Sequence, residues 1–174
     1  MAEGILLEPV ARETLLPEAS RVLRLEVALP QIRAVIAGET DAVALQATLA
    51  CLLWEALPQT NWCGFYRRVG ESQLAVGPYQ GTMGCLRIDF ARGVCGAAAR
   101  TRTVQRVPDV HAFPGHISCD ARSRSELVIP VVNQGELRAV LDLDSPHLDA
   151  FSEREAEILH AFVDEVLGAG GVVY

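Results

Sequence analysis

The sequence predicts an α+β fold, in which an antiparallel sheet has helices packed mainly on one of its faces. Two observations predict this class. Apolar residues recur at helical intervals near both ends of the chain, over 40–57 and 152–168. The region between them holds short apolar runs separated by turns, including two long runs joined by a hairpin-type connection at 133–135.

Length and composition predict one domain with a proper core. The chain has 174 residues, of which 50% are hydrophobic and 21% are charged, and this balance excludes a disordered chain. The net charge of −7 and the pI near 5.1 weigh against a nucleic-acid partner, which requires a basic surface. All 15 basic residues are arginine, which excludes Schiff-base lysines and the P-loop lysine.

The sequence also predicts a cytoplasmic protein with no membrane segment. No apolar stretch approaches the roughly 18 residues that a membrane span needs. Acids and prolines interrupt the first 20 residues before a signal-peptide core could form.

The expected helices follow from capping residues and helix breakers. Residues 18–29 favour a helix, and Pro30 is expected to interrupt it, which gives one broken helix or two short ones. Thr40 and Asp41 can cap a helix that ends at Pro58, and Cys51 inside it is expected in the core. The last helix begins at Ser152 with a capping box and runs to Gly168.

The central region is expected to form strands, with one short helix opening near Val94. The two strongest strands are 126–132 and 136–144. The weaker strand predictions cover residues 62–67, 73–79, 85–90 and 104–107.

Five cysteines in a chain without an export signal favour catalytic, metal-binding or buried thiols over structural disulfides. Cys85, Cys95 and Cys119 form no CxxC pair, so a structural zinc site is not expected. Each of the three lies where exposure is plausible, and Cys95 falls in the first turn of an expected helix, where the dipole favours a thiolate. Cys119 lies in the long connection 108–125, which is typical of a functional loop. The alternative is three buried, inert thiols.

Three acids form a second candidate group. Asp142 and Asp144 are two apart in one strand and therefore point to the same face, and Glu126 starts the neighbouring strand. If they lie close together, they raise one another's pKa values, and one can stay protonated at neutral pH. The alternatives are strand-end acids that face water or ligands of a divalent metal.

The aromatic and histidine residues give weaker signals. Trp62 and Tyr66 could line a pocket for a small apolar group, whereas Phe65 is expected in the core. His111 and His116 could bind a metal with Cys119, although loop histidines are more often solvated. The residues by themselves assign no role to Cys63.

Six segments nevertheless strongly resemble the free methionine-(R)-sulfoxide reductases, enzymes built on a GAF domain. The segments occur in order and are NWCGFY (61–66), VGPYQG (76–81), CLRIDFARGVCG (85–96), VPDVHAFPGHISCD (107–120), SELVIP (125–130) and VLDLDSP (140–146). The resemblance covers about residues 36–160. It implies a six-stranded antiparallel sheet flanked by helices, reduction of free methionine-(R)-sulfoxide without a bound cofactor or metal, recycling by thioredoxin, and a possible homodimer.

The resemblance also implies a role for each matching residue. Cys119 matches the nucleophilic cysteine, Cys85 the resolving cysteine, and Cys95 a third cysteine of less settled role. The positions around the substrate's polar groups and its methyl end match Glu126, Asp142, Asp144, Trp62 and Tyr66. The chain departs from the family pattern at Cys63, Arg122, Arg124 and Ala139.

The expected organisation is an N-terminal helical segment (1–37) that packs on a GAF-like catalytic domain (38–168), followed by a short tail (169–174). Two other functions remain open on the sequence. One is a non-enzymatic GAF sensor of a small ligand, which leaves the three cysteines without a duty. The other is a thiol redox switch, which leaves the acids and Trp62 unexplained.

Overall fold

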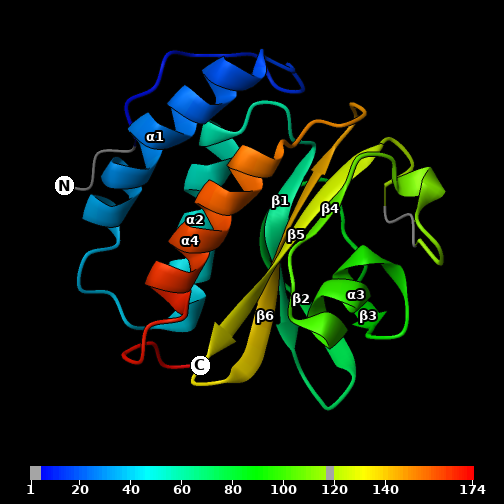
Figure 1. Cartoon of the computed structure of the whole chain (residues 1–174). Coiled ribbons are helices and arrows are strands. Elements are labelled where there is room, and N and C mark those ends of the chain that lie inside the picture. Colours follow the sequence, from blue (N-terminus) through cyan, green and yellow to red (C-terminus); the bar gives the residue numbers. More distant parts are fainter. Residues whose placement is uncertain (1–4, 117–119) are drawn as a thin grey trace.

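The computed structural model describes residues 5–116 and 120–174. The described residues form a six-stranded sheet in which all neighbouring strands are antiparallel, in the order β3-β2-β1-β6-β5-β4 (Figure 1). This confirms the predicted α+β class and the six-stranded antiparallel sheet. The strands are β1 (Trp62–Arg68), β2 (Gln73–Gly81), β3 (Arg87–Asp89), β4 (Gln105–Val107), β5 (Ser125–Asn133) and β6 (Glu136–Ser145).

Helices cover the two faces of the sheet unequally. Helices α1 (Glu18–Val35), α2 (Ala42–Ala56) and α4 (Glu153–Leu167) lie on one side, and α3 (Gly93–Thr101) lies on the other (Figure 1). Each side has its own apolar cluster. Phe65 and Leu141 belong to the cluster under the three helices, whereas Tyr66 and Val140 belong to the cluster toward α3. The period-two alternation of β1 and β6 therefore reserves one face of both strands for the side toward α3.

The centre of the sheet brings distant parts of the chain together. Strand β6 lies between β1 and β5, so Asp144 pairs with Trp62 on one side and with Glu126 on the other. The predicted hairpin between β5 and β6 is present, and its turn residues Gln134 and Gly135 both adopt positive φ angles, 52° and 76°. A short 3-10 helix, η1 (Val110–Ala112), interrupts the connection from β4 to β5.

Helix α1 corrects the expectation of a break at Pro30. The helix continues from Glu18 to Val35 with Pro30 inside it. Proline removes one backbone hydrogen bond, but its neighbours Leu25, Leu29 and Ile32 bury one stripe of the helix against the core. Burial of each such side chain contributes about 1.5–3 kcal/mol, which offsets the lost hydrogen bond.

Helices α2 and α4 have the predicted caps. The Asp41 side chain accepts a hydrogen bond from the Ala44 amide, and Ser152 and Glu155 form the reciprocal capping box. Cys51 does not lie in the core as expected, because it projects from α2 into solvent. Among the helices of residues 5–116 and 120–174, none is both long and apolar enough to cross a membrane.

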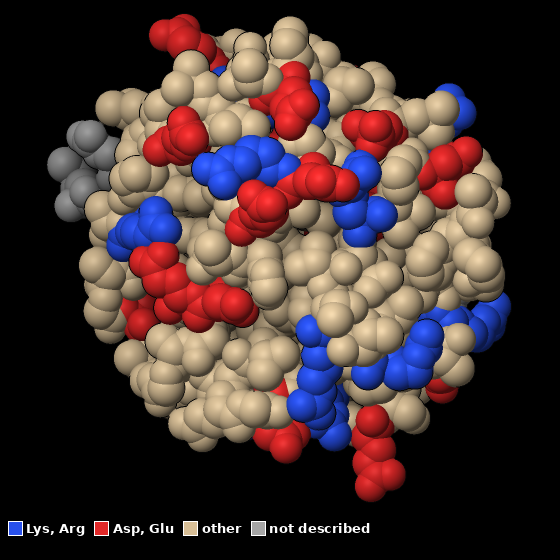
Figure 2. All heavy atoms as spheres, in the orientation of Figure 1, with Lys and Arg blue, Asp and Glu red and all other residues tan. Residues whose placement is uncertain are grey.

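The molecular surface carries mixed charge. On the face drawn in Figure 2, arginines and carboxylates are interspersed rather than gathered into one continuous basic stripe. One ion pair is different, because it is buried between α1 and α4. The guanidinium of Arg21 donates to both carboxylate oxygens of Glu155 at 2.8–3.1 Å, and these side chains are 7% and 0% exposed.

Loss of this buried pair should destabilise the fold strongly. We expect Arg21→Met to lower the free energy of unfolding by about 3–5 kcal/mol, because the Glu155 carboxylate stays buried without its partner. Urea unfolding followed by circular dichroism measures the change. Arg33→Met is the matched control, since Arg33 pairs with Glu165 between the same two helices while both side chains are at least 40% exposed. Arg33→Met should lower the free energy of unfolding by no more than about 1 kcal/mol. Equal losses in the two variants would contradict a special contribution of the buried pair.

Candidate active site

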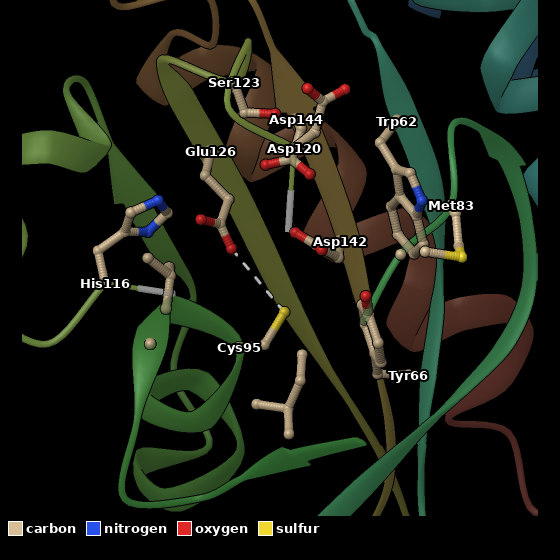
Figure 3. Close-up of a pocket in the computed structure, with 14 residues that line it drawn as sticks. Trp62, Tyr66, Met83, Cys95, His116, Asp120, Ser123, Glu126, Asp142 and Asp144 are labelled. Carbon is tan, nitrogen blue, oxygen red and sulfur yellow. Dashed lines mark hydrogen bonds between the residues drawn. The ribbon is translucent and has the colours of Figure 1, made fainter. Parts of the chain in front are cut away.

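A pocket opens on the face of the sheet toward α3, where β1 begins and β6 ends (Figure 3). It holds about 510 Å³ of empty space, counted out to the solvent at its mouth. Its walls come from β1, β5, β6, the start of α3 and two loops. Six of the eight residues that the sequence singles out line it: Trp62, Tyr66, Cys95, Glu126, Asp142 and Asp144.

The three acids converge on the floor of this pocket. Asp142 and Asp144 point to the same face of β6, and Glu126 extends toward them from β5 (Figure 3). Glu126 and Asp142 are only 6% and 5% exposed. Burial, followed by repulsion from Asp142, disfavours ionisation of Glu126, so Glu126 holds its proton more tightly than an isolated acid does.

Burial keeps these acids partly protonated. It is the largest cause of the shift at each position, and it raises the pKa of Asp142 to about 7. The pKa values of Glu126 and Asp144 lie well above their usual range, because burial is reinforced by repulsion from Asp142. The pocket therefore contains neutral carboxylic acid at pH 7, whereas a carboxyl group exposed to water is ionised at this pH and cannot donate a proton.

Cys95 faces the same acids but does not behave as expected. It lies in the first turn of α3, as predicted, yet it is 4% exposed and its sulfur points at Glu126 Oε1 over 3.8 Å (Figure 3). Burial, followed by repulsion from Asp142 and Glu126, raises the pKa of the Cys95 thiol well above its usual range. The helix dipole contributes only about 0.3–1 kcal/mol, so it cannot offset burial beside carboxylates. The expectation of an exposed thiolate at Cys95 is wrong.

An aromatic wall faces the acids across the pocket. The rings of Trp62 and Tyr66 stack with centroids 5.3 Å apart, and Tyr79 stacks on Trp62 at the same distance. A side chain at position 84 would crowd this wall, since a Cβ atom there would lie 2.7 Å from the hydroxyl oxygen of Tyr66. The indole nitrogen of Trp62 is buried and has no hydrogen-bond acceptor among the described residues. The wall thus offers flat apolar surface and one unused donor.

The two remaining predicted cysteines belong to loops. Cys85 lies two residues before β3 rather than starting it, because the strand predicted at 85–90 covers only Arg87–Asp89. Cys85 is disulfide-bonded, whereas the thiols of Cys51, Cys63 and Cys95 are free. Cys119 lies outside the described residues. The predicted metal ligands His111 and His116 contact each other edge to face, and His116 lines the pocket.

A different group has the spacing of metal ligands within the described part of the chain. The sulfur of Cys95 and one oxygen each of Glu126 and Asp142 lie within 4.8 Å of one another. A metal ion would have to displace protons from these groups, since all three have raised pKa values. Proton-bearing acid chemistry therefore suits this group better at neutral pH.

Sequence reasoning missed Asp120, which also lines the pocket. Its carboxylate accepts hydrogen bonds from Thr82 Oγ1 at 2.9 Å, Asn61 Nδ2 at 3.3 Å and Arg122 Nη2 at 2.9 Å. The Arg122 side chain is the largest cause that lowers the pKa of Asp120, to about 2. Asp120 thereby ties the chain next to Cys119 to the loop that carries Cys85. The signal was present, because Asp120 also accepts from the Arg122 amide, as an aspartate does two residues ahead in an Asx turn.

Comparison with known proteins places this arrangement in a family. The GAF domain model matches residues 25–169. Free methionine-R-sulfoxide reductase of Escherichia coli is 43% identical over 133 residues, which cover 76% of this chain and 80% of that protein. The enzyme of Saccharomyces cerevisiae is 38% identical over 129 residues, or 70% and 72% of the two chains.

A solved structure agrees in fold as well as in sequence. Free methionine-R-sulfoxide reductase from Neisseria meningitidis, solved in complex with its substrate, superposes with a TM-score of 0.79 at 41% identity. The superposition covers 87% of this chain and 90% of that one. The chain therefore belongs to the GAF-domain family of free methionine-R-sulfoxide reductases.

Proposed function

We propose that this protein reduces free methionine-(R)-sulfoxide to methionine by cysteine chemistry. The observation that carries the proposal is the pocket itself, where buried, proton-bearing carboxyl groups face a stacked aromatic wall. The activity named for the relatives with 38–43% identity gives independent support.

The pocket suits the three parts of this substrate. The methyl end of the side chain packs against Trp62 and Tyr66, whose rings form the apolar wall. The substrate ammonium binds whichever of the three acids Glu126, Asp142 and Asp144 is ionised, because a cation is favoured beside buried negative charge. The unpartnered indole N–H of Trp62 is available to a substrate oxygen.

The first chemical step transfers one oxygen atom. The Cys119 thiolate attacks the sulfoxide sulfur while the Glu126 and Asp142 pair supplies a proton to the sulfoxide oxygen. The protonated oxygen then passes from the substrate sulfur to Cys119 Sγ, and the transient bond between the two sulfurs breaks, so methionine leaves with its sulfur reduced and Cys119 becomes a sulfenic acid. Cys95 remains a neutral thiol in this scheme, and its contact with Glu126 helps to position the proton donor.

The second step restores the enzyme. The Cys85 thiol condenses with the sulfenic acid at Cys119, which forms a disulfide and releases water. The disulfide state of Cys85 supports its role as the resolving cysteine. A dithiol reductant of the thioredoxin type then reduces the disulfide by exchange. Such a reductant fits the reducing cytoplasm, which is the location that we propose.

A coupled assay with separated substrates tests the proposal. The full chain is mixed with thioredoxin, thioredoxin reductase and NADPH, and free R or S methionine sulfoxide is added. We expect NADPH loss with the R form and none above background with the S form. Binding of the R form without turnover would instead indicate a sensor. Oxidation by peroxide with no sulfoxide turnover would indicate a thiol switch.

A further inference from the structure

A second hollow lies at the opposite end of β1 and β6 from the candidate active site. The start of α2, the end of β1, the start of β6 and Tyr174 surround it. Tyr66 lines the first pocket and the next residue, Arg67, lines this groove, but successive residues of a strand point to opposite faces of the sheet. The two sites are therefore separate. We call this second hollow the arginine groove, after Arg67, Arg68 and Arg138 in its lining.

The positive charge in the arginine groove is only partly balanced. Arg68 donates to Glu136 Oε2 at 2.9 Å. Arg67 and Arg138 form no ion pair with any residue in the described part of the chain. The Arg138 guanidinium lies over the Tyr174 ring, 5.6 Å from its centroid, and this contact leaves the positive charge without a carboxylate partner. The field of Arg67 and Arg138 favours an anionic ligand.

Two buried polar atoms of opposite kind accompany these charges. Arg138 Nε can only donate a hydrogen bond, and Gln46 Oε1 can only accept one. Both atoms are buried, and neither has a partner among the described residues. Gln46 is 1% exposed, so the amide has been taken from water without compensation from the protein. Leaving each such atom unpaired destabilises the fold, and a ligand with matching groups would recover that loss.

We propose that the arginine groove binds a small oxyanion that also carries a hydroxyl group, of the phosphate class. Its negative oxygens accept hydrogen bonds from Arg138 and Arg67, and its hydroxyl donates to Gln46 Oε1. Both inorganic phosphate and a phosphate ester with a free hydroxyl meet these demands. Sulfate matches phosphate in shape and charge but has no hydroxyl, so the groove discriminates between them.

Titration of the full chain at pH 7 and constant ionic strength tests this proposal. We expect calorimetry to show saturable phosphate binding with a dissociation constant of about 1–10 mM and sulfate binding at least about threefold weaker. The side-chain amide resonance of Gln46 should shift with phosphate along the same curve. Glycerol 3-phosphate, measured in parallel, shows whether free or esterified phosphate is preferred.

Variants assign the binding to the groove. Arg138→Met and Arg67→Met should each weaken phosphate binding about tenfold, which corresponds to one lost charge-assisted hydrogen bond. Gln46→Met should remove the preference for phosphate over sulfate. Arg87→Met is the matched control, because Arg87 is exposed on β3 outside the groove, and its binding curve should be unchanged.

Three outcomes would overturn the proposal. They are the absence of saturation, an equal loss in the Arg87→Met control, and equal affinity for sulfate and phosphate in the unmodified protein. The exposed position of Arg67 keeps its variant informative even if Arg138→Met folds poorly. None of these measurements uses methionine sulfoxide, so their failure would leave the proposed reductase activity untouched.

Discussion

Cys119→Ser is expected to abolish turnover of free methionine-(R)-sulfoxide, with a fall in kcat of at least about 10⁴-fold. A serine hydroxyl has a pKa far above that of a thiol and forms no sulfenic acid, so oxygen transfer has no acceptor. The coupled NADPH assay measures the loss. Substrate binding should persist, because the proposed binding groups are the three acids of the pocket and the aromatic wall, and Cys119 is not among them.

The resolving cysteine should give a different result from the nucleophile. Cys85→Ser should release about one equivalent of methionine in a single turnover and then stall in the thioredoxin-coupled assay. Cys51→Ser is the matched control, since Cys51 is a free, exposed thiol on α2, and it should retain full steady-state turnover. Unreduced steady-state turnover in Cys85→Ser would remove that residue from the scheme.

Asp142→Asn should inactivate the enzyme and stabilise the fold at the same time. Loss of an acid from the proton-donating pair should lower kcat by about 10²–10⁴-fold, the usual contribution of general acid catalysis. The free energy of unfolding should rise instead, because a buried asparagine does not ionise as pH rises and so carries no buried charge. Asp164→Asn, at an exposed position on α4, is the control and should change neither quantity.

The sign of the pH effect follows from the raised pKa of Asp142. In the unfolded chain this carboxyl ionises near pH 4, whereas in the folded protein it ionises near pH 7. Between these values the folded state binds more protons, so the free energy of unfolding falls as pH rises from about 4 through 7. Asp142→Asn should recover roughly 2–4 kcal/mol at pH 8 and almost nothing at pH 4.

Urea unfolding at pH 4 and pH 8 checks this dependence. The proposed proton donor also predicts that kcat/KM of the unmodified enzyme falls at a pH above 7, where the Glu126 and Asp142 pair loses its last proton. A variant that gained no stability at pH 8, or a rate that rose without limit above pH 7, would contradict the assigned protonation.

Local patterns were reliable where one short-range interaction decides the outcome. The capping box at Ser152, the cap at Asp41 and the β5–β6 turn each depend on residues within a few positions, and all three are present. Prediction failed where distant packing decides. Pro30 lies inside a continuous helix because the rest of α1 is held against the core, and Cys51 points outward.

The candidate site shows the same division. Alternation alone put Asp142 and Asp144 on one face, because the two-residue period of a strand is a local property. The raised pKa of the Cys95 thiol could not be foreseen, because the burial of this thiol beside Glu126 depends on where α3 packs on the sheet. Asp120 was missed for a related reason, since its hydrogen-bond partners include Asn61 and Thr82, far away in the chain.

The sequence by itself determined the α+β class, most element positions and the residue types available for thiol and acid chemistry. These properties follow from local periodicity, capping and composition. Only the tertiary structure decided which groups are protonated and which thiols are accessible. Protonation depends on burial and on charges brought close by β6 lying between β1 and β5, and no local pattern encodes that environment.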